Sequence, residues 1–135
     1  MDWKLELIVL PVSDLDRAKA FYTEQAGFTV DVDVTVGESM RIVQPTPPGS
    51  ACSVTLMHND NAGTVQGLHL VVNDIDAARA ELVGRGADVS EAYHFADGVQ
   101  TPGPDPEHRD YGSFLSFSDP DGNGWLVQEV NRSTA

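Results

Sequence analysis

The sequence predicts an α+β fold made of two tandem β-α-β-β-β modules in a single domain, residues 1–135. The first observation is an internal repeat: I-V-L-P-V-S-D-L-D-R-A-K-A at 8–20 returns as L-H-L-V-V-N-D-I-D-A-A-R-A at 68–80, at a constant offset of 60 residues. The second is that alternating strand patterns and turn signals follow each copy. We therefore place the first module at 4–58 and the second at 67–130, and expect the ligand pocket between them.

The first module begins with an apolar strand and a helix capped by Ser13 or Asp14 and closed by Gly27. A polar-apolar alternation then indicates a half-buried strand, and the turn sequence T-P-P-G-S separates the two strands of a hairpin. The expected elements are a strand at 4–12, a helix at 16–25 and strands at 28–36, 40–44 and 51–58.

A polar linker at 59–66 leads to the second module. Its expected elements are a strand at 67–72, a helix at 75–85 and strands at 88–93, 113–118 and 125–130. Residues 95–111 contain three prolines and two glycines, so we expect an irregular loop there. Loops of this length in compact domains usually act as lids or binding loops.

Composition excludes several classes of function. A formal net charge of −13 argues against nucleic acid, whose binding depends on Lys and Arg, and against anionic membrane surfaces. No apolar run approaches the length of a membrane span, and the first residues do not resemble a signal peptide. The single cysteine, Cys52, rules out an intrachain disulfide framework, and we expect a cytoplasmic protein.

Three motifs carry a family resemblance: V-S-D-L-D-R-A-K-A-F-Y at the first helix, V-N-D-I-D-A-A-R-A at the second, and F-S-D-P-D-G-N-G-W before the last strand. They resemble the vicinal oxygen chelate superfamily, which includes glyoxalase I, bleomycin-resistance proteins, fosfomycin-resistance enzymes and extradiol dioxygenases. The resemblance implies paired modules whose sheets curl into a U-shaped cavity, commonly in a homodimer. It implies a site but not a particular reaction.

Enzymes of this superfamily usually hold a divalent metal through His and Glu side chains. The resemblance maps the ligand positions onto Leu7, Thr55, Gly67 and Leu126, none of which is a His, Asp or Glu. Divalent cations need imidazole or carboxylate ligands. We therefore expect no metal and no other cofactor, which counts against glyoxalase I activity, extradiol cleavage and metal-dependent fosfomycin opening.

The cavity is expected to be mostly apolar, with a few polar groups. Alternate residues of a strand share one face, so the predicted cavity face collects Leu5, Leu7, Val9, Ser53, Thr55, Met57, Gly67, His69, Val71, Leu126 and Gln128. The candidate ligand-binding residues are Leu7, Val9, Gln44, Ser53, Thr55, Met57, His69, Tyr111, Leu126 and Gln128.

His69 is the candidate catalytic residue, acting as a general acid or base. The alternative is a buried histidine whose hydrogen bonds go to a backbone carbonyl or a neighbouring side chain. His94 and His108 bracket the long loop, which either closes over the cavity with Arg109 and Tyr111 or is a solvated surface loop. The D-P-D-G-N-G stretch is expected to be a turn, and Trp3 and Trp125 to be core or subunit-interface aromatics. Cys52 is expected to be a small buried hydrophobe and His58 to be exposed.

Three functions stay open at this stage. The leading one is metal-free binding of a small, partly apolar molecule, as in the antibiotic-sequestering bleomycin-resistance branch. The second is a metal-independent lyase, isomerase or dioxygenase-type enzyme that uses His69. The third is a metal enzyme with a displaced site, recruiting His69 with Glu129 or His94.

Overall fold

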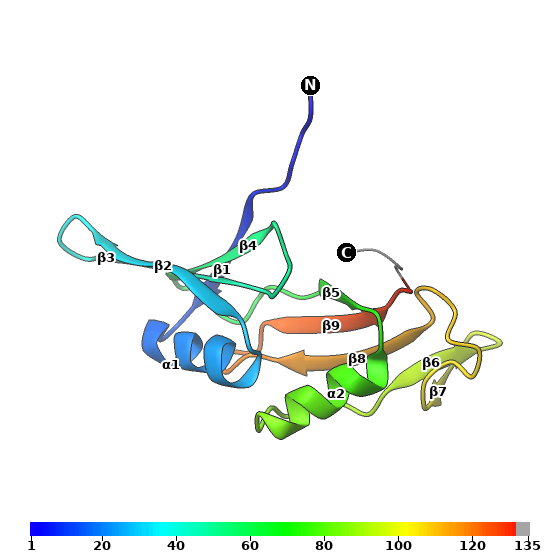
Figure 1. Cartoon of the computed structure of the whole chain (residues 1–135). Coiled ribbons are helices and arrows are strands. Elements are labelled where there is room, and N and C mark those ends of the chain that lie inside the picture. Colours follow the sequence, from blue (N-terminus) through cyan, green and yellow to red (C-terminus); the bar gives the residue numbers. More distant parts are fainter. Residues whose placement is uncertain (132–135) are drawn as a thin grey trace. The chain divides into compact units, whose positions relative to one another are not determined.

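The computed structural model describes residues 1–131 and divides the chain into two compact units. The first contains residues 1–65 and 119–123, and the second contains residues 66–118 and the chain from 124 onward. Each unit holds one sheet with its own helix (Figure 1). The α+β class and the doubled strand-helix-strand order that the repeat predicted are confirmed.

The first unit has a four-stranded sheet in the order β1-β4-β3-β2, in which β1 runs parallel to β4 and the other pairs are antiparallel. Asp14 is the N-cap of α1, and its side chain accepts a hydrogen bond from the Arg17 backbone nitrogen at 3.1 Å. The elements are β1 (Leu7–Val12), α1 (Leu15–Ala20), the π-helical turn η1 (Phe21–Gln25), β2 (Thr29–Val36), β3 (Met40–Thr46) and β4 (Ser53–His58).

The core of the first unit lies between this sheet and its helix. Alternation along the strands sends one set of side chains toward α1 and η1 and the other set to the opposite, open face. The buried set comprises Leu10, Val12, Ala18, Phe21, Tyr22, Val43, Val54 and Leu56. Burial of this set fixes which strand residues remain on the open face.

The D-P-D-G-N-G stretch forms a turn, as expected, but its residues 119–123 belong to the first unit. The buried Tyr22 hydroxyl donates to an Asp119 carboxylate oxygen at 2.8 Å. The buried Asn123 amide donates to the Pro11 carbonyl at 3.0 Å and accepts from the Val65 backbone nitrogen at 3.1 Å. These bonds explain why the turn is rich in Asp and Asn without forming a calcium loop.

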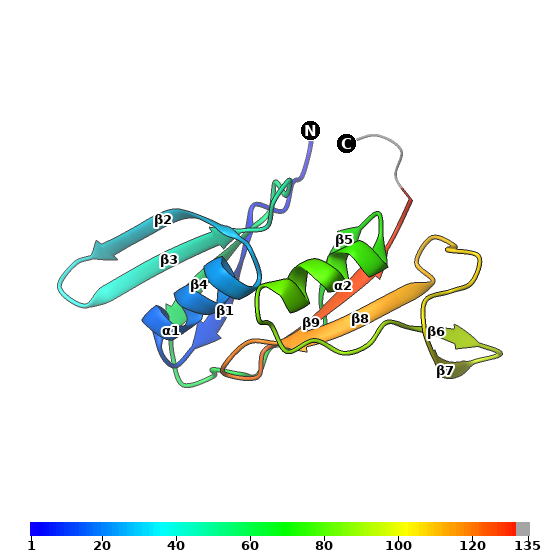
Figure 2. The same ribbon diagram turned by 60° about the horizontal axis from the view of Figure 1, so that its bottom comes forward.

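The second unit repeats the plan with a five-stranded sheet in the order β5-β9-β8-β6-β7 (Figure 2). Helix α2 covers one face, where Ile75, Leu82, Leu115, Phe117, Trp125 and Val127 are buried. The Phe117 and Trp125 rings stack with centroids 6.0 Å apart. The elements are β5 (Leu68–Val72), α2 (Ile75–Gly84), β6 (Tyr93–Ala96), β7 (Val99–Pro102), β8 (Ser113–Ser118) and β9 (Gly124–Glu129).

Several sequence predictions are wrong in detail. The strand expected at 88–93 begins only at Tyr93, because residues 88–92 make a single isolated bridge, between Val89 and Phe117. The stretch 95–111 is not wholly irregular, since β6 and β7 pair as a hairpin through the D-G turn at 97–98. The first strand starts at Leu7, so Leu5 precedes the sheet.

The two tryptophans differ. Trp125 is buried in the core, as predicted, whereas Trp3 is exposed and belongs to no core. Cys52 is half-buried and His58 is exposed. Within residues 1–131, no helix is long and apolar enough to cross a membrane.

Candidate functional site

The open face of the second sheet brings together several of the predicted site residues. His69 on β5 lies opposite Leu126 on β9, which lies opposite Ser116 on β8. A second row runs from Val71 through Gln128 and Phe114 to Tyr93 on β6. Because these residues share strand parity, they point away from α2. The sequence thus places His69, Leu126 and Gln128 correctly on one face.

His69 lines a hollow of about 320 Å³ on this face, together with Gln66, Gly67, Ser116, Phe117, Ser118, Gly124, Trp125 and Leu126. The Nδ1 atom of His69 lies 2.6 Å from the Gly67 carbonyl oxygen. Since a carbonyl only accepts, Nδ1 carries the proton, and Nε2 is the accepting nitrogen of the neutral ring. His69 is exposed, so it can accept a hydrogen bond from a ligand in this hollow.

A second hollow, of about 510 Å³, shares one lining residue, Ser116, with the first. Its other lining residues are Ser90, Glu91, Ala92, Tyr93, Gln100 and Pro102. Burial raises the pKa of the Tyr93 phenol. Tyr93 is therefore neutral at physiological pH and presents an apolar ring with a hydroxyl to this hollow.

Three aromatic rings form a cluster where β6 meets β8. Tyr93 stacks on Phe114 with centroids 5.6 Å apart, and Phe95 meets Phe114 edge-on at 5.8 Å and Tyr93 at 6.1 Å. The Phe95 side chain is exposed although it is large and apolar. This cluster was not predicted from the sequence. The alternation Y-H-F-A before a D-G turn could have revealed the hairpin that builds it.

The first sheet has a matching open face, which carries the other strand candidates. Leu7 lies opposite Ser53 and Val9 opposite Thr55, with Met57 next along β4. The Thr55 hydroxyl lies 3.4 Å from the Gln44 side-chain oxygen on β3. This face also carries Met40 and Ile42 on β3, which share strand parity with Gln44, and the Ser53 and Thr55 side chains on β4 are buried.

The strand registers show which positions correspond in the two modules. Val9 pairs with Thr55 on β4. His69, the residue that corresponds to Val9 in the repeat, pairs with Leu126 on β9 in the same way. Thr55 and Leu126 therefore occupy the same place in the repeat. Two leucines, a glycine and a threonine stand at the four positions where the superfamily resemblance would put metal ligands. These side chains do not fit a divalent cation.

Within residues 1–131, no group of three or more His, Cys, Asp or Glu side chains could hold a metal ion. His94, a candidate for a displaced site, instead lies with Nδ1 2.7 Å from the Gly103 carbonyl oxygen. This bond ties the start of the 103–112 loop to β6.

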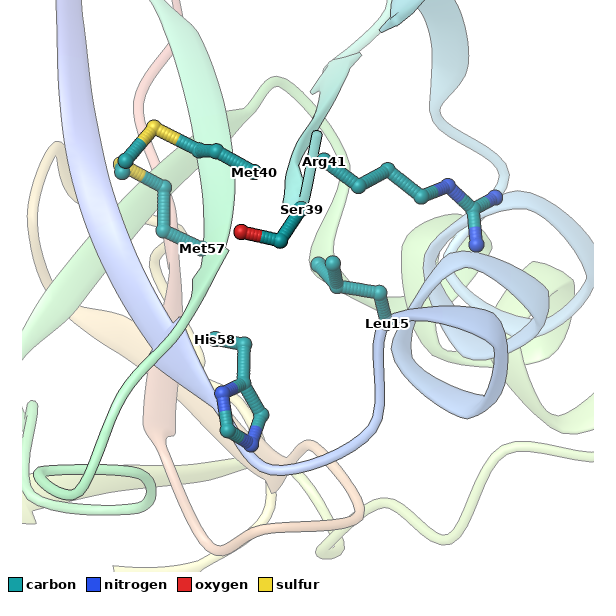
Figure 3. Close-up of a pocket in the computed structure, with 6 residues that line it drawn as sticks. All are labelled: Leu15, Ser39, Met40, Arg41, Met57 and His58. Atoms are coloured by element: carbon teal, nitrogen blue, oxygen red, sulfur yellow. The ribbon is translucent and has the colours of Figure 1, made fainter. Parts of the chain in front are cut away.

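A third hollow, of about 400 Å³, lies beside the start of β3 and the end of β4 (Figure 3). It contains Met57, a predicted site residue, together with Leu15, Ser39, Met40, Arg41 and His58. Figure 3 shows the Arg41 side chain extending toward α1.

The Arg41 guanidinium donates two bonds of 2.9 Å to Asp33 and one of 2.6 Å to Asp16. Together with Lys19, it holds the pKa of Asp33 well below its usual range. The Arg41 charge is therefore already neutralised by these carboxylates. A ligand in the hollow would contact the apolar side chains of Met40, Met57 and Leu15 rather than a free positive charge.

The 103–112 loop is anchored to its own unit. Glu129, buried at the end of β9, accepts from the Ile75 backbone nitrogen at 2.8 Å and from His108 Nδ1 at 2.9 Å. That carboxylate raises the pKa of His108. The Tyr111 backbone nitrogen donates to the Glu129 carbonyl at 2.8 Å, with Tyr111 at φ +61° and its side chain exposed.

Comparison with known proteins agrees with this architecture. The family model of the Glyoxalase/Bleomycin resistance protein/Dioxygenase superfamily matches residues 4–127. The chain belongs to that superfamily, and the predicted resemblance is confirmed.

Three relatives are informative. The antibiotic-binding protein TnmS3 from Streptomyces sp. CB03234 is 30% identical, with a TM-score of 0.74 over 96% of this chain and 97% of that one. A glyoxalase/bleomycin resistance protein from the same strain is 31% identical, with a TM-score of 0.71 over 93% of this chain and 100% of that one. The uncharacterized protein YetH of Bacillus subtilis (strain 168) is 24% identical over 90% of this chain and 94% of its own length.

Proposed function

We propose that this protein binds a small, partly apolar molecule on the open face of its second sheet without the superfamily's usual divalent metal. The observation that carries the proposal is the pair of hollows that both include Ser116 in their lining, with His69 lining one and Tyr93 the other. Small-molecule sites are concave, largely apolar and carry a few orienting polar groups. The hollow that His69 lines has this character, whereas the hollow that Tyr93 lines is more polar, with Ser90, Glu91 and Gln100 around it.

The chemistry of the lining favours an aromatic ligand with a hydrogen-bond donor. The cluster of Tyr93, Phe95 and Phe114 offers ring faces and edges for stacking. His69 Nε2 and Gln128 offer acceptors along the neighbouring strands. Leu7, Val9, Gln44, Ser53, Thr55 and Met57 of the first sheet's open face, and Tyr111 of the second unit, stay predicted ligand-binding residues that the two hollows do not include.

The relatives support the same class of function. TnmS3 is an antibiotic-binding protein, and the second relative from its strain is a glyoxalase/bleomycin resistance protein. We infer that this chain likewise sequesters an antibiotic-like compound, in the cytoplasm. Metal independence follows from the lack of carboxylate or imidazole at Leu7, Thr55, Gly67 and Leu126.

A metal-independent enzyme is the second candidate, favoured by the tautomer of His69. An exposed imidazole whose Nδ1 proton is held by the Gly67 carbonyl presents Nε2 as a base toward the hollow. In that role His69→Ala abolishes turnover of a substrate. In the binding role the same change weakens affinity by about 1–3 kcal/mol, the cost of one unpaired buried polar group.

Two measurements test the proposal. The first is the metal content of the untagged protein after incubation with zinc, nickel, manganese and iron(II) and then desalting. The second is thermal-shift screening of planar naphthalene, quinoline and acridine compounds and antibiotics, followed by calorimetric titration of the hits. We expect no retained metal and at least one aromatic ligand.

Phe95→Ala provides the matched variant, since Phe95 is exposed and its loss leaves the core intact. We expect the dissociation constant of the hit to rise about ten-fold, from lost stacking and apolar contact. Val83→Ala, on the exposed side of α2, is the control and should leave the affinity unchanged. One metal ion held per chain, or affinity indifferent to Phe95→Ala, would contradict the proposal.

A further inference from the structure

The hollow that Tyr93 lines contains a carboxylate that no basic side chain neutralises. Glu91 is exposed and lines this hollow of about 510 Å³ together with Tyr93 and Gln100. The described residues that line it include no Lys or Arg. Within residues 1–131, no Lys, Arg or His nitrogen lies within 4.0 Å of the Glu91 carboxylate. The hollow therefore presents a negative charge that has no partner in the protein.

The arginines of the second unit are engaged elsewhere. Its described part has three of them, Arg79, Arg85 and Arg109, and no lysine. Arg85 and Arg109 form ion pairs with acids four residues before them, at 3.5 and 3.6 Å. Arg79 Nε donates to the Ser90 carbonyl at 3.0 Å. A positive charge beside Glu91 is thus left for a ligand to supply.

Glu91 belongs to no strand, but hydrogen bonds fix the backbone on both sides of it. The Ser90 nitrogen donates to the Ser116 carbonyl at 2.9 Å. The Ser90 hydroxyl accepts from the Ser116 nitrogen at 2.9 Å and donates to the Glu91 carbonyl at 2.9 Å. The Ala92 carbonyl accepts from the Gly103 nitrogen at 2.8 Å. Because this backbone is already ordered, binding at Glu91 costs less conformational entropy.

The aromatic cluster beside this carboxylate also suits a cation. Tyr93 lines the hollow and stacks on Phe114, and Phe95 meets both rings edge-on. The face of an aromatic ring attracts an ammonium group that lies within about 6 Å of its centre. The same rings provide stacking partners for an aromatic ligand.

Neutral acceptors complete the lining. An ammonium group has three N–H donors and no acceptor. Besides the Glu91 carboxylate, the Gln100 side-chain oxygen and the Ser116 hydroxyl can accept from it. Gln100 lies opposite Phe95 in the hairpin of β6 and β7, so the two residues share one face of the sheet. The hollow thus combines a charge, acceptors and ring surfaces that match an aromatic amine.

The charge of the whole chain acts in the same direction. The formal net charge is −13, and a protein of this charge draws cations toward its surface and repels anions. This general attraction is screened over about 8 Å at physiological salt. It therefore favours the approach of an amine, whereas the selectivity depends on Glu91.

We propose that the ligand of the second sheet is an aromatic molecule carrying a protonated amine. Its ammonium lies beside Glu91, and its ring lies against Tyr93, Phe95 and Phe114. This inference rests on the proposed function and names the chemical class of the ligand for the same face.

Calorimetric titration with three matched probes tests the inference. The probes are naphthylethylamine, its N-acetyl derivative and naphthylpropionate, which are cationic, neutral and anionic at pH 7. We expect the amine to bind at least about ten-fold more tightly than the N-acetyl compound, from the charged hydrogen bond and the cation–π contact, and the propionate to bind most weakly. Glu91→Gln should reduce the preference for the amine to about two-fold and leave the affinity for the N-acetyl compound unchanged.

Two further variants show whether the position of the charge matters. Glu81→Gln, on the exposed side of α2, removes the same charge far from the hollow's lining and should keep the full preference for the amine. Glu91→Lys should reverse the order, so that the propionate binds more tightly than the amine. Circular dichroism should show the same fold for all the variants, because both glutamates are exposed.

Equal affinity for the amine and the N-acetyl compound, or an unchanged preference in Glu91→Gln, would overturn this inference. The proposed function would stand in that case, since the neutral probe still binds. A loss of preference in Glu81→Gln as large as that in Glu91→Gln would also overturn it, because net charge rather than the hollow would be responsible. Failure of all three probes to bind would count against both proposals.

Discussion

Asn123→Ala is the substitution that we expect to destabilise the first unit most clearly. The side chain is fully buried in the turn between β8 and β9. Its amide nitrogen donates to the Pro11 carbonyl at 3.0 Å and to Asp119 at 2.9 Å, and its oxygen accepts from the Val65 nitrogen at 3.1 Å. Alanine removes all three bonds and leaves the buried Pro11 carbonyl without this donor.

The magnitude follows from these contacts. Each of the three hydrogen bonds contributes about 1 kcal/mol net, and a buried group left unsatisfied adds about 1 kcal/mol, so the loss is about 4 kcal/mol. The total free energy of unfolding of a small protein is about 5–15 kcal/mol. With a slope of about 2 kcal/mol per molar urea, the unfolding midpoint should fall by about 2 M.

Equilibrium unfolding in urea, followed by circular dichroism, measures this change. Asn59→Ala is the matched control, because Asn59 is exposed and accepts a single bond, from the Asn61 nitrogen at 2.8 Å. The control should lose less than about 1 kcal/mol. A loss below about 1 kcal/mol in Asn123→Ala as well would refute the reasoning that this turn is held by its amide.

Two further predictions concern the 103–112 loop and the segment around Gly63 that connects β4 to β5. His108→Gln should destabilise the protein below pH 6.5 and progressively less as the pH rises. The reason is that Glu129 raises the pKa of folded His108 above its ordinary 6.5, so the stability that protonated His108 adds is lost as the pH passes the raised value. A pH-independent difference in unfolding free energy would contradict this. Gly63→Ala should cost about 2–5 kcal/mol, because its Cβ would lie 2.2 Å from the Asp121 carbonyl oxygen at φ +82°. Gly49→Ala, at φ +78° with nothing within 4 Å, should cost only the strain of about 1 kcal/mol, and equal melting temperatures for the two variants would count against the close approach.

The repeat explains why so much of the fold could be predicted. Asp14 and Asp74 both cap their helices, and β8 and β9 bury alternate residues because the period-2 pattern is a local property. The face shared by His69, Leu126 and Gln128 followed from this alternation alone. Residues 88–102 were mispredicted because two short strands joined by a two-residue turn carry weak periodicity in a Pro- and Gly-rich stretch.

The sequence by itself determined the two-module plan and the superfamily, because these depend on residue identity and near-neighbour spacing. Only the tertiary structure decided that Tyr93, Phe95 and Phe114 cluster, that Ser116 lines two hollows, and that residues 119–123 are held by Tyr22 and Pro11. Each of these contacts joins separate segments of the chain. Their geometry depends on strand register and on how α1 and α2 pack, which no local pattern specifies.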